Sequence, residues 1–125
     1  MKLEQLIERI KRHPDYHQAG MILAHNGVVR QTSLDGQNVT GLRVAVDREK
    51  LERILARQKK TPGIVDILVE IFDERDLAVG DDVMFLVVAG DIRENVLTVL
   101  GETLNEIKTT VTQKTEFYAD MAKSR

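Results

Sequence analysis

The sequence predicts an α+β fold, with helices packed on one face of a largely antiparallel sheet. Stretches with helical spacing of apolar residues alternate with stretches of strand-like alternation, and from residue 38 onward their order is β-α-β-β-α-β. The length of 125 residues fits one domain, so we expect residues 1–125 to form a single domain. Aromatic residues make up 4% of the chain and tryptophan is absent, which predicts an aliphatic core.

The first predicted elements are a helix and a strand. Apolar residues recur at helical spacing near the start of the chain, at Leu3, Leu6, Ile7 and Ile10. Because Pro14 disfavours helical backbone at the preceding residue, residues 1–18 are expected to form an N-terminal helix and a connection. Residues 19–30 then have the composition of a strand, and Asp35-Gly36 predicts a turn after it.

The middle of the chain predicts a strand, a helix and a second strand. Leu42, Val44 and Val46 alternate with more polar or smaller residues, as in a half-buried strand. Asp47 is expected to cap a helix that stops before the Thr61-Pro62-Gly63 segment. Residues 65–71 follow with the clearest strand pattern in the chain.

The C-terminal part adds a strand, a helix and a last strand. An apolar strand over residues 83–89 is followed by Asp91 and Glu94 at capping-box spacing, and the helix that they start should run to about Ile107. The Thr-rich segment 108–117 predicts the last strand, and residues 119–125 a flexible tail.

Composition argues against several functions. The chain has no cysteine, which removes thiolate nucleophiles, Cys-ligated zinc and iron–sulfur clusters. His13 and His17 are separated by Pro14 and His25 stands alone on a strand, so we expect no metal site. A net charge of -2 argues against nucleic-acid binding. With neither a signal-peptide core nor an apolar run long enough for a membrane span, we expect a soluble, cytoplasmic protein.

Two features point to an anion site, each with a simpler alternative. The turn at residues 89–93 offers helix N-terminal N–H groups and Arg93 to a phosphate, but a plain connection capped by Asp91 is the favoured interpretation. Lys108 and Lys114 are an even number of residues apart, which places both on one face of the predicted last strand. With Arg30 and Arg93 they would form a basic pocket; edge-strand lysines that discourage aggregation remain the alternative.

From Gly20 to about Tyr118, the sequence resembles the large, catalytic subunit of molybdopterin synthase, the MoaE-type family. The order and spacing of several segments carry this resemblance: 27–30, the Asp35-Gly36 turn, 39–42, 77–82, 83–88, the helix with Arg93, and 107–109. The resemblance implies an α/β-hammerhead-like fold, a homodimer and a ubiquitin-like small subunit that delivers sulfur as a C-terminal thiocarboxylate. It also implies conversion of cyclic pyranopterin monophosphate to molybdopterin, with no cofactor in the large subunit.

The resemblance also assigns candidate site residues. Arg30 falls on the family's strand-end arginine and Arg93 on the arginine of its His-Arg pair, which implies substrate binding by both. Lys108 falls on the first catalytic lysine, and Lys114 is the nearest substitute for the second, which implies catalytic roles. We therefore expect Arg30, Arg93 and Lys108 to converge on one anion site.

Several positions depart from the family pattern, and two of them fall on its site residues. Ile92 stands where the family has the histidine of its pair, and Thr115 where it has the second lysine. Two other hypotheses therefore stay open beside the enzyme. One is a family member that retains the fold and dimer but is catalytically impaired or binds another anionic ligand or protein partner. The other is an α+β interaction module whose basic residues are solvated surface.

Overall fold

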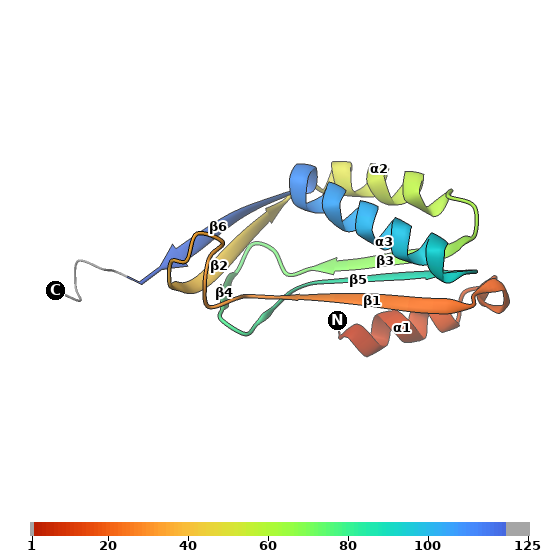
Figure 1. Cartoon of the computed structure of the whole chain (residues 1–125), viewed down its shortest axis with the longest axis horizontal. Coiled ribbons are helices and arrows are strands. Elements are labelled where there is room, and N and C mark those ends of the chain that lie inside the picture. The colour runs from red at the N-terminus through yellow and green to blue at the C-terminus, as the bar shows by residue number, and fades with distance from the viewer. Residues whose placement is uncertain (1, 120–125) are drawn as a thin grey trace.

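Two antiparallel sheets of three strands each form the framework of the computed structural model, which describes residues 2–119 (Figure 1). The first sheet has the order β1-β5-β3, formed by Met21–Val28, Asp82–Gly90 and Ile64–Ile71. The second has the order β4-β2-β6, formed by Asp76–Ala78, Val39–Val46 and Thr112–Tyr118. The predicted α+β class is confirmed, but the strands form two sheets where the sequence suggested one. Of the expected tail, residues 120–125 lie outside the described residues.

Helices cover both faces of the first sheet, so the expectation of helices on one face is wrong. In Figure 1, α2 (Arg48–Lys59) and α3 (Arg93–Glu106) lie on one side, and α1 (Leu3–Lys11) lies on the other. A short 3-10 helix, Tyr16–Gln18, follows α1. None of the helices among residues 2–119 is long and apolar enough to span a membrane.

The central strand β5 explains why both faces are covered. Phe85, Val87 and Ala89 pack against the α1 side, whereas Leu86 and Val88 pack against the α3 side. All five are buried, and Leu86, Val87 and Val88 have no exposed surface. A strand that is apolar on both faces needs a covering layer on each of them, and its continuous apolar run is the sequence signal for this.

The predicted last strand begins later than expected. Residues Ile107–Val111 form a π-helical turn, η2, that continues α3, and β6 begins at Thr112. The hydroxyls of Thr109 and Thr110 donate to the carbonyls of Asn105 (2.9 Å) and Glu106 (2.7 Å). These local bonds hold the helical backbone and override the β propensity of threonine. Lys108 therefore lies on a turn.

The start of α3 also differs from the prediction. Its N-cap is Ile92, whose side chain makes no capping hydrogen bond. Asp91 lies one residue earlier, where its carboxylate accepts hydrogen bonds from the Ile92 backbone N–H (2.7 Å) and the Asn95 side chain (2.8 Å). These bonds, with the Asn95 contribution the larger, hold the pKa of Asp91 below its usual value. The carboxylate thus anchors the turn without capping the helix.

Candidate functional site

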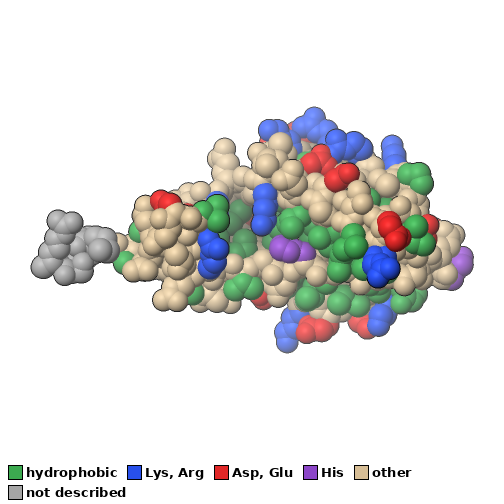
Figure 2. Space-filling view, viewed as in Figure 1, with side chains coloured by type: hydrophobic (Ala, Val, Ile, Leu, Met, Phe, Trp, Pro, Cys, Tyr) green, Lys and Arg blue, Asp and Glu red, His purple; other side chains and the backbone are tan. Residues whose placement is uncertain are grey.

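A pocket of about 540 Å³ lies where the two sheets meet, next to the π-helical turn. Its wall is largely apolar and includes side chains of both sheets: Val29, Leu42, Val44, Ile71, Val83 and Met84. Three basic side chains line it, from three separate parts of the chain: Arg30, Lys108 and Lys114. Figure 2 shows basic side chains and a histidine among apolar ones on this face. The pocket suits a ligand with an anionic group and an apolar body.

The register of β6 places Lys114 in the pocket. Lys114 pairs with Val44 of β2, which is 3% exposed and lines the same pocket. Thr115 pairs with Arg43, which is exposed. Because successive residues of a strand point to opposite faces, Thr115 faces away from the pocket. Lys114, rather than the residue after it, is therefore the lysine that β6 brings to the site.

Lys108 reaches the pocket from η2. The side chains of Ile107 and Val111, four residues apart, are buried in the same core cluster and fix the turn against the second sheet. Lys108 directly follows Ile107 and is exposed at the pocket. The two lysines do line one pocket as expected, but they do so from a turn and a strand and not from a shared strand face.

Arg30 follows β1 at the rim of the pocket. Val29, which precedes it, is 4% exposed and holds this part of the chain against the core. The Arg30 Nε–H donates to the carbonyl of Thr32 at 2.6 Å. This bond ties the guanidinium to the loop that leads into β2, so that the positive charge is kept at the pocket.

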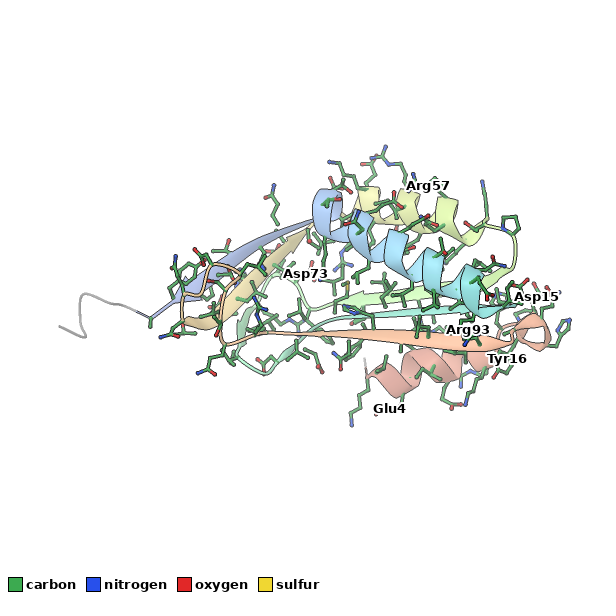
Figure 3. All side chains as sticks on the ribbon, in the orientation of Figure 1. Glu4, Asp15, Tyr16, Arg57, Asp73 and Arg93 are labelled. Carbon is green, nitrogen blue, oxygen red and sulfur yellow. The ribbon has the colours of Figure 1, made fainter. Side chains whose placement is uncertain are left out.

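Arg93 does not join these residues within one chain, so the predicted convergence of Arg30, Arg93 and Lys108 is wrong for the single chain. Met21 pairs with Gly90, close to Arg93, whereas Val28, close to Arg30, pairs with Asp82. Seven residues of β1 separate the two positions. At a strand rise of about 3.3 Å per residue, the two ends of β1 are about 23 Å apart, and Arg30 and Arg93 lie near opposite ends. Figure 3 shows Arg93 at the end of the first sheet where α3 begins.

One carboxylate, that of Glu116, balances part of the charge in the pocket. Its side chain is 23% exposed, and one oxygen lies 3.9 Å from Lys114 Nζ. The other accepts a hydrogen bond from the Tyr118 hydroxyl at 3.0 Å. That bond is the main reason why the pKa of Tyr118 is raised. Three basic groups against one acidic group leave the pocket with a net positive charge.

His25, which the sequence suggested was isolated, lies beside this pocket. Its Nε2 is buried and has no hydrogen-bond partner within the part of the chain that the structure describes. Burial, and secondarily the positive charge of Lys108, lower the pKa of His25. The sequence did contain a signal for this position. Because side chains alternate along a strand, His25 lies on the same face of β1 as Met21 and Leu23, which pack against the core.

The described residues give no sign of a metal centre. No group of three or more His, Cys, Asp or Glu side chains among residues 2–119 is arranged to hold an ion. His13 instead accepts a hydrogen bond at Nδ1 from the backbone N–H of Asp15, at 3.0 Å.

The fold and the pocket define a small α+β protein with a pocket of basic and apolar side chains where two sheets meet. The family model described as MoaE protein matches residues 1–110. The chain therefore belongs to the MoaE family. Comparison with curated proteins gave no match.

Solved structures share the fold. Molybdopterin synthase from Staphylococcus aureus has a TM-score of 0.77 at 20% identity, covering 96% of this chain and 87% of that one. The molybdopterin cofactor biosynthesis protein E of Burkholderia multivorans has a TM-score of 0.74 at 18% identity, with coverages of 98% and 89%. A complex of subunits 1 and 2 of molybdopterin-converting factor from Helicobacter pylori has a TM-score of 0.70 at 18% identity, with coverages of 97% and 86%.

Proposed function

We propose that this protein is the large, catalytic subunit of a molybdopterin synthase and acts in molybdenum cofactor biosynthesis. In this role it converts cyclic pyranopterin monophosphate to molybdopterin. One observation carries the proposal: in a chain of the MoaE family, Arg30, Lys108 and Lys114 line one pocket with apolar walls. The S. aureus structure, itself a molybdopterin synthase, shares the fold and supports the same role.

The pocket can bind the substrate through two kinds of contact, one with its charged groups and one with its apolar surface. Arg30, held by its bond to Thr32, suits a substrate phosphate, since a guanidinium offers several donors in a planar arrangement. The apolar wall, which includes Ile71 and Met84, suits the ring system of the substrate. Binding in this orientation presents the carbon atoms that gain sulfur to the lysine side of the pocket.

Lys108 and Lys114 supply the chemistry. A lysine can act as a nucleophile toward an electrophilic carbon, or its ammonium can stabilise negative charge that develops as sulfur adds. Lys108 has no acidic partner among the ion pairs of the described residues, whereas Lys114 lies near Glu116. We therefore assign the main catalytic role to Lys108 and a supporting one to Lys114.

The absence of cysteine from the chain is compatible with a partner that carries the sulfur. We propose a ubiquitin-like small subunit whose C-terminal thiocarboxylate enters the pocket. The H. pylori structure is a complex of two subunits and has the same fold in the matching chain, which supports such a partner. No nucleic acid or membrane is part of this proposal.

Arg93 can contribute to the same site only from a second copy of the chain. It lies at the opposite end of the first sheet from Arg30, so one chain cannot bring both to one ligand. We propose a homodimer in which Arg93 of one copy approaches the pocket of the other and binds the substrate there. Each dimer would then hold two equivalent sites.

A second candidate function is favoured by Ile92. This residue is 53% exposed at the start of α3, directly before Arg93, and its side chain offers no hydrogen bond to a phosphate and no proton. A family member with this change would retain the fold and the dimer but bind an anionic ligand or a protein partner without turnover.

Reconstitution of the reaction tests the proposal. The chain is mixed with a thiocarboxylated small subunit and cyclic pyranopterin monophosphate, and the dithiolene product is measured. The control uses the same small subunit with an ordinary C-terminal carboxylate, which has no sulfur to give. Product that depends on the thiocarboxylate supports the enzyme. Substrate binding without product from any competent small subunit supports the second candidate instead.

A further inference from the structure

A buried polar atom next to the pocket is left unpaired. His25 Nε2 is one of two buried side-chain polar atoms without a hydrogen-bond partner among residues 2–119, the other being the Thr103 hydroxyl. Buried polar groups are almost always paired, so an exception beside a binding pocket requires a physical explanation. A nearby side chain that pairs with Nε2 during function would supply one.

The geometry shows that the imidazole leans toward the pocket. His25 lies on β1 opposite Leu86, on the face that packs against α3. A Cβ placed on Gly27 would lie 3.4 Å from His25 Nε2 and 3.8 Å from the carbonyl oxygen of Met84. Nε2 therefore lies above Gly27, directly before the residues of β1 that line the pocket. Glycine at this position leaves room for the ring.

Lys108 is the charged group that acts on this imidazole. Lys108 and Met84 both line the pocket, and the Met84 carbonyl lies near the same point above Gly27 as His25 Nε2. The positive charge of Lys108 lowers the pKa of His25, in addition to the larger effect of burial. The elements packed on this side contribute apolar side chains: Leu86 from β5, and Leu100 and Leu104 from α3. A neutral His25 ring has one nitrogen with a free lone pair, which can accept a hydrogen bond. An ammonium group has only donors, so the two groups are complementary.

We propose that His25 is a positioning residue: its Nε2 accepts a hydrogen bond from the Lys108 ammonium and holds it at the inner wall of the pocket. In this position Lys108 meets the anionic group of the ligand. The inference rests on the role given to Lys108 under the proposed function and adds a residue that nothing in the family resemblance assigns. It requires the tautomer with the proton on Nδ1.

Nitrogen NMR of the imidazoles in the wild-type chain tests the tautomer without any substitution. We expect His25 at pH 7 to be neutral, with an unprotonated Nε2 whose resonance moves when Lys108 is replaced in Lys108→Met. The nitrogen shifts identify directly which ring nitrogen carries the proton. A proton on Nε2, or a resonance that does not respond to Lys108→Met, would overturn the proposal.

Anion binding tests the consequence for the pocket. Sulfate, which stays fully ionised, is titrated into wild type, His25→Phe, His25→Gln, Lys108→Met and the double variant His25→Phe/Lys108→Met. We expect His25→Phe to weaken binding about fivefold, and His25→Gln to recover most of it, since glutamine retains an acceptor. In the Lys108→Met background His25→Phe should have almost no further effect, because the two residues act as one unit.

The two experiments separate this inference from the proposed function. Additive losses in the double variant, or a Gln variant as weak as the Phe variant, overturn the role of His25 even if the chain makes product. If the wild type binds no sulfate and makes no product, the proposed function fails. In that case the nitrogen NMR experiment, which gives the His25 tautomer and the response of the Nε2 resonance to Lys108→Met, still decides the role of His25. Circular dichroism of each variant confirms that the fold is retained.

Discussion

Lys108 and Lys114 line the same pocket under different constraints. Lys108 is on a helical turn held by threonine hydroxyls, while Lys114 is fixed in the ladder between β2 and β6. The charge of Lys114 is also partly offset by Glu116 at 3.9 Å. The two lysines have the same side chain but different electrostatic surroundings, so we expect them to contribute unequally to catalysis.

Replacement of each lysine tests this difference. Lys108→Ala should abolish dithiolene formation, because loss of a nucleophile or of a preorganised charge typically lowers a rate by about a hundredfold or more. Lys114→Ala should have an intermediate effect. Lys50→Ala, on the exposed surface of α2, is the matched control and should retain full activity. Thermal unfolding should be almost unchanged in all three, and full activity in both pocket variants would show that these lysines are ordinary surface residues.

Two glycines show how position decides the effect of one methyl group. Gly63, between α2 and β3, has φ +89°, and an added Cβ would collide with the Asp91 carboxylate and lie 2.6 Å from Asn95 Nδ2. Gly63→Ala should destabilise the fold by about 2 kcal/mol, from strained backbone and this contact. Gly101 lies in α3 with open space around it, so Gly101→Ala should stabilise by about 0.5–1 kcal/mol. Urea unfolding measures both, and equal effects would contradict the prediction.

At the level of elements, α2 and α3 are joined by a polar contact. Gln58 is 6% exposed and its amide donates to Glu106 at 2.7 Å, while Arg57 pairs with the other oxygen of the same carboxylate. The hydrogen bond from Gln58 is the main cause, and Arg57 a further one, of a lowered pKa of Glu106. The two helices are therefore held together more firmly when Glu106 is ionised.

The stability of the fold should depend on pH through this contact. The folded-state pKa of Glu106 lies below its unfolded value, so its contribution is present above about pH 4.5 and is lost as the pH falls through the folded pKa. In urea unfolding at pH 7, 5 and 3, Glu106→Gln should lose less stability on acidification than wild type. Glu52→Gln, on the exposed face of α2, is the control. An equal loss in wild type and Glu106→Gln would exclude this contribution.

Most elements could be predicted from apolar periodicity, and the exceptions have local causes. The strand over 65–71 and the helix capped by Asp47 follow the sequence, because alternation and a capping side chain act within a few residues. The π-helical turn at Ile107–Val111 was missed, since threonine side chains there bond to the helix backbone instead of extending a strand. β4 spans only Asp76–Ala78 and pairs with β2, a partner about thirty residues away in the sequence.

At the scale of the whole molecule, we predict that the chain forms a homodimer. The resemblance to the MoaE family implies it, and two large apolar side chains are exposed near the start of α3: Ile92, the N-cap of α3 (53%), and Leu97 within α3 (50%). Sedimentation velocity should give a dimer at micromolar concentrations, and a monomer throughout that range would contradict the prediction.

Mixing inactive chains tests whether the dimer shares its sites. Lys108→Ala and Arg93→Ala, each inactive alone, should regain activity on mixing, because half of the dimers are mixed and one of their two sites has both side chains. The expected recovery is on the order of a quarter of wild-type activity. No recovery from chains that do exchange would show that Arg93 does not act in the pocket of the other copy.

The site was only partly predictable because its residues meet through the tertiary fold. Arg30, Lys108 and Lys114 line one pocket, as their basic chemistry suggested. Arg93 was grouped with them because it too follows a strand, but the sequence does not say at which end of the sheet a strand finishes. The face of Lys114 also depends on the register with Val44, which a shift of one residue would reverse.

The pairing of β2 with β6 also determines when the pocket can come into existence during synthesis. β2 ends at Val46, yet its long partner begins only at Thr112, so a nascent chain emerging from the ribosome holds most of this strand unpaired until β6 has been made. Closing so long a loop is slow, whereas β3 and β5 lie close in sequence and meet early. Chains interrupted before the last strand can build the helix-covered sheet, but they lack Lys114 and the part of the pocket lining that β6 contributes. A fully lined pocket therefore requires that β6 has been made and paired with β2.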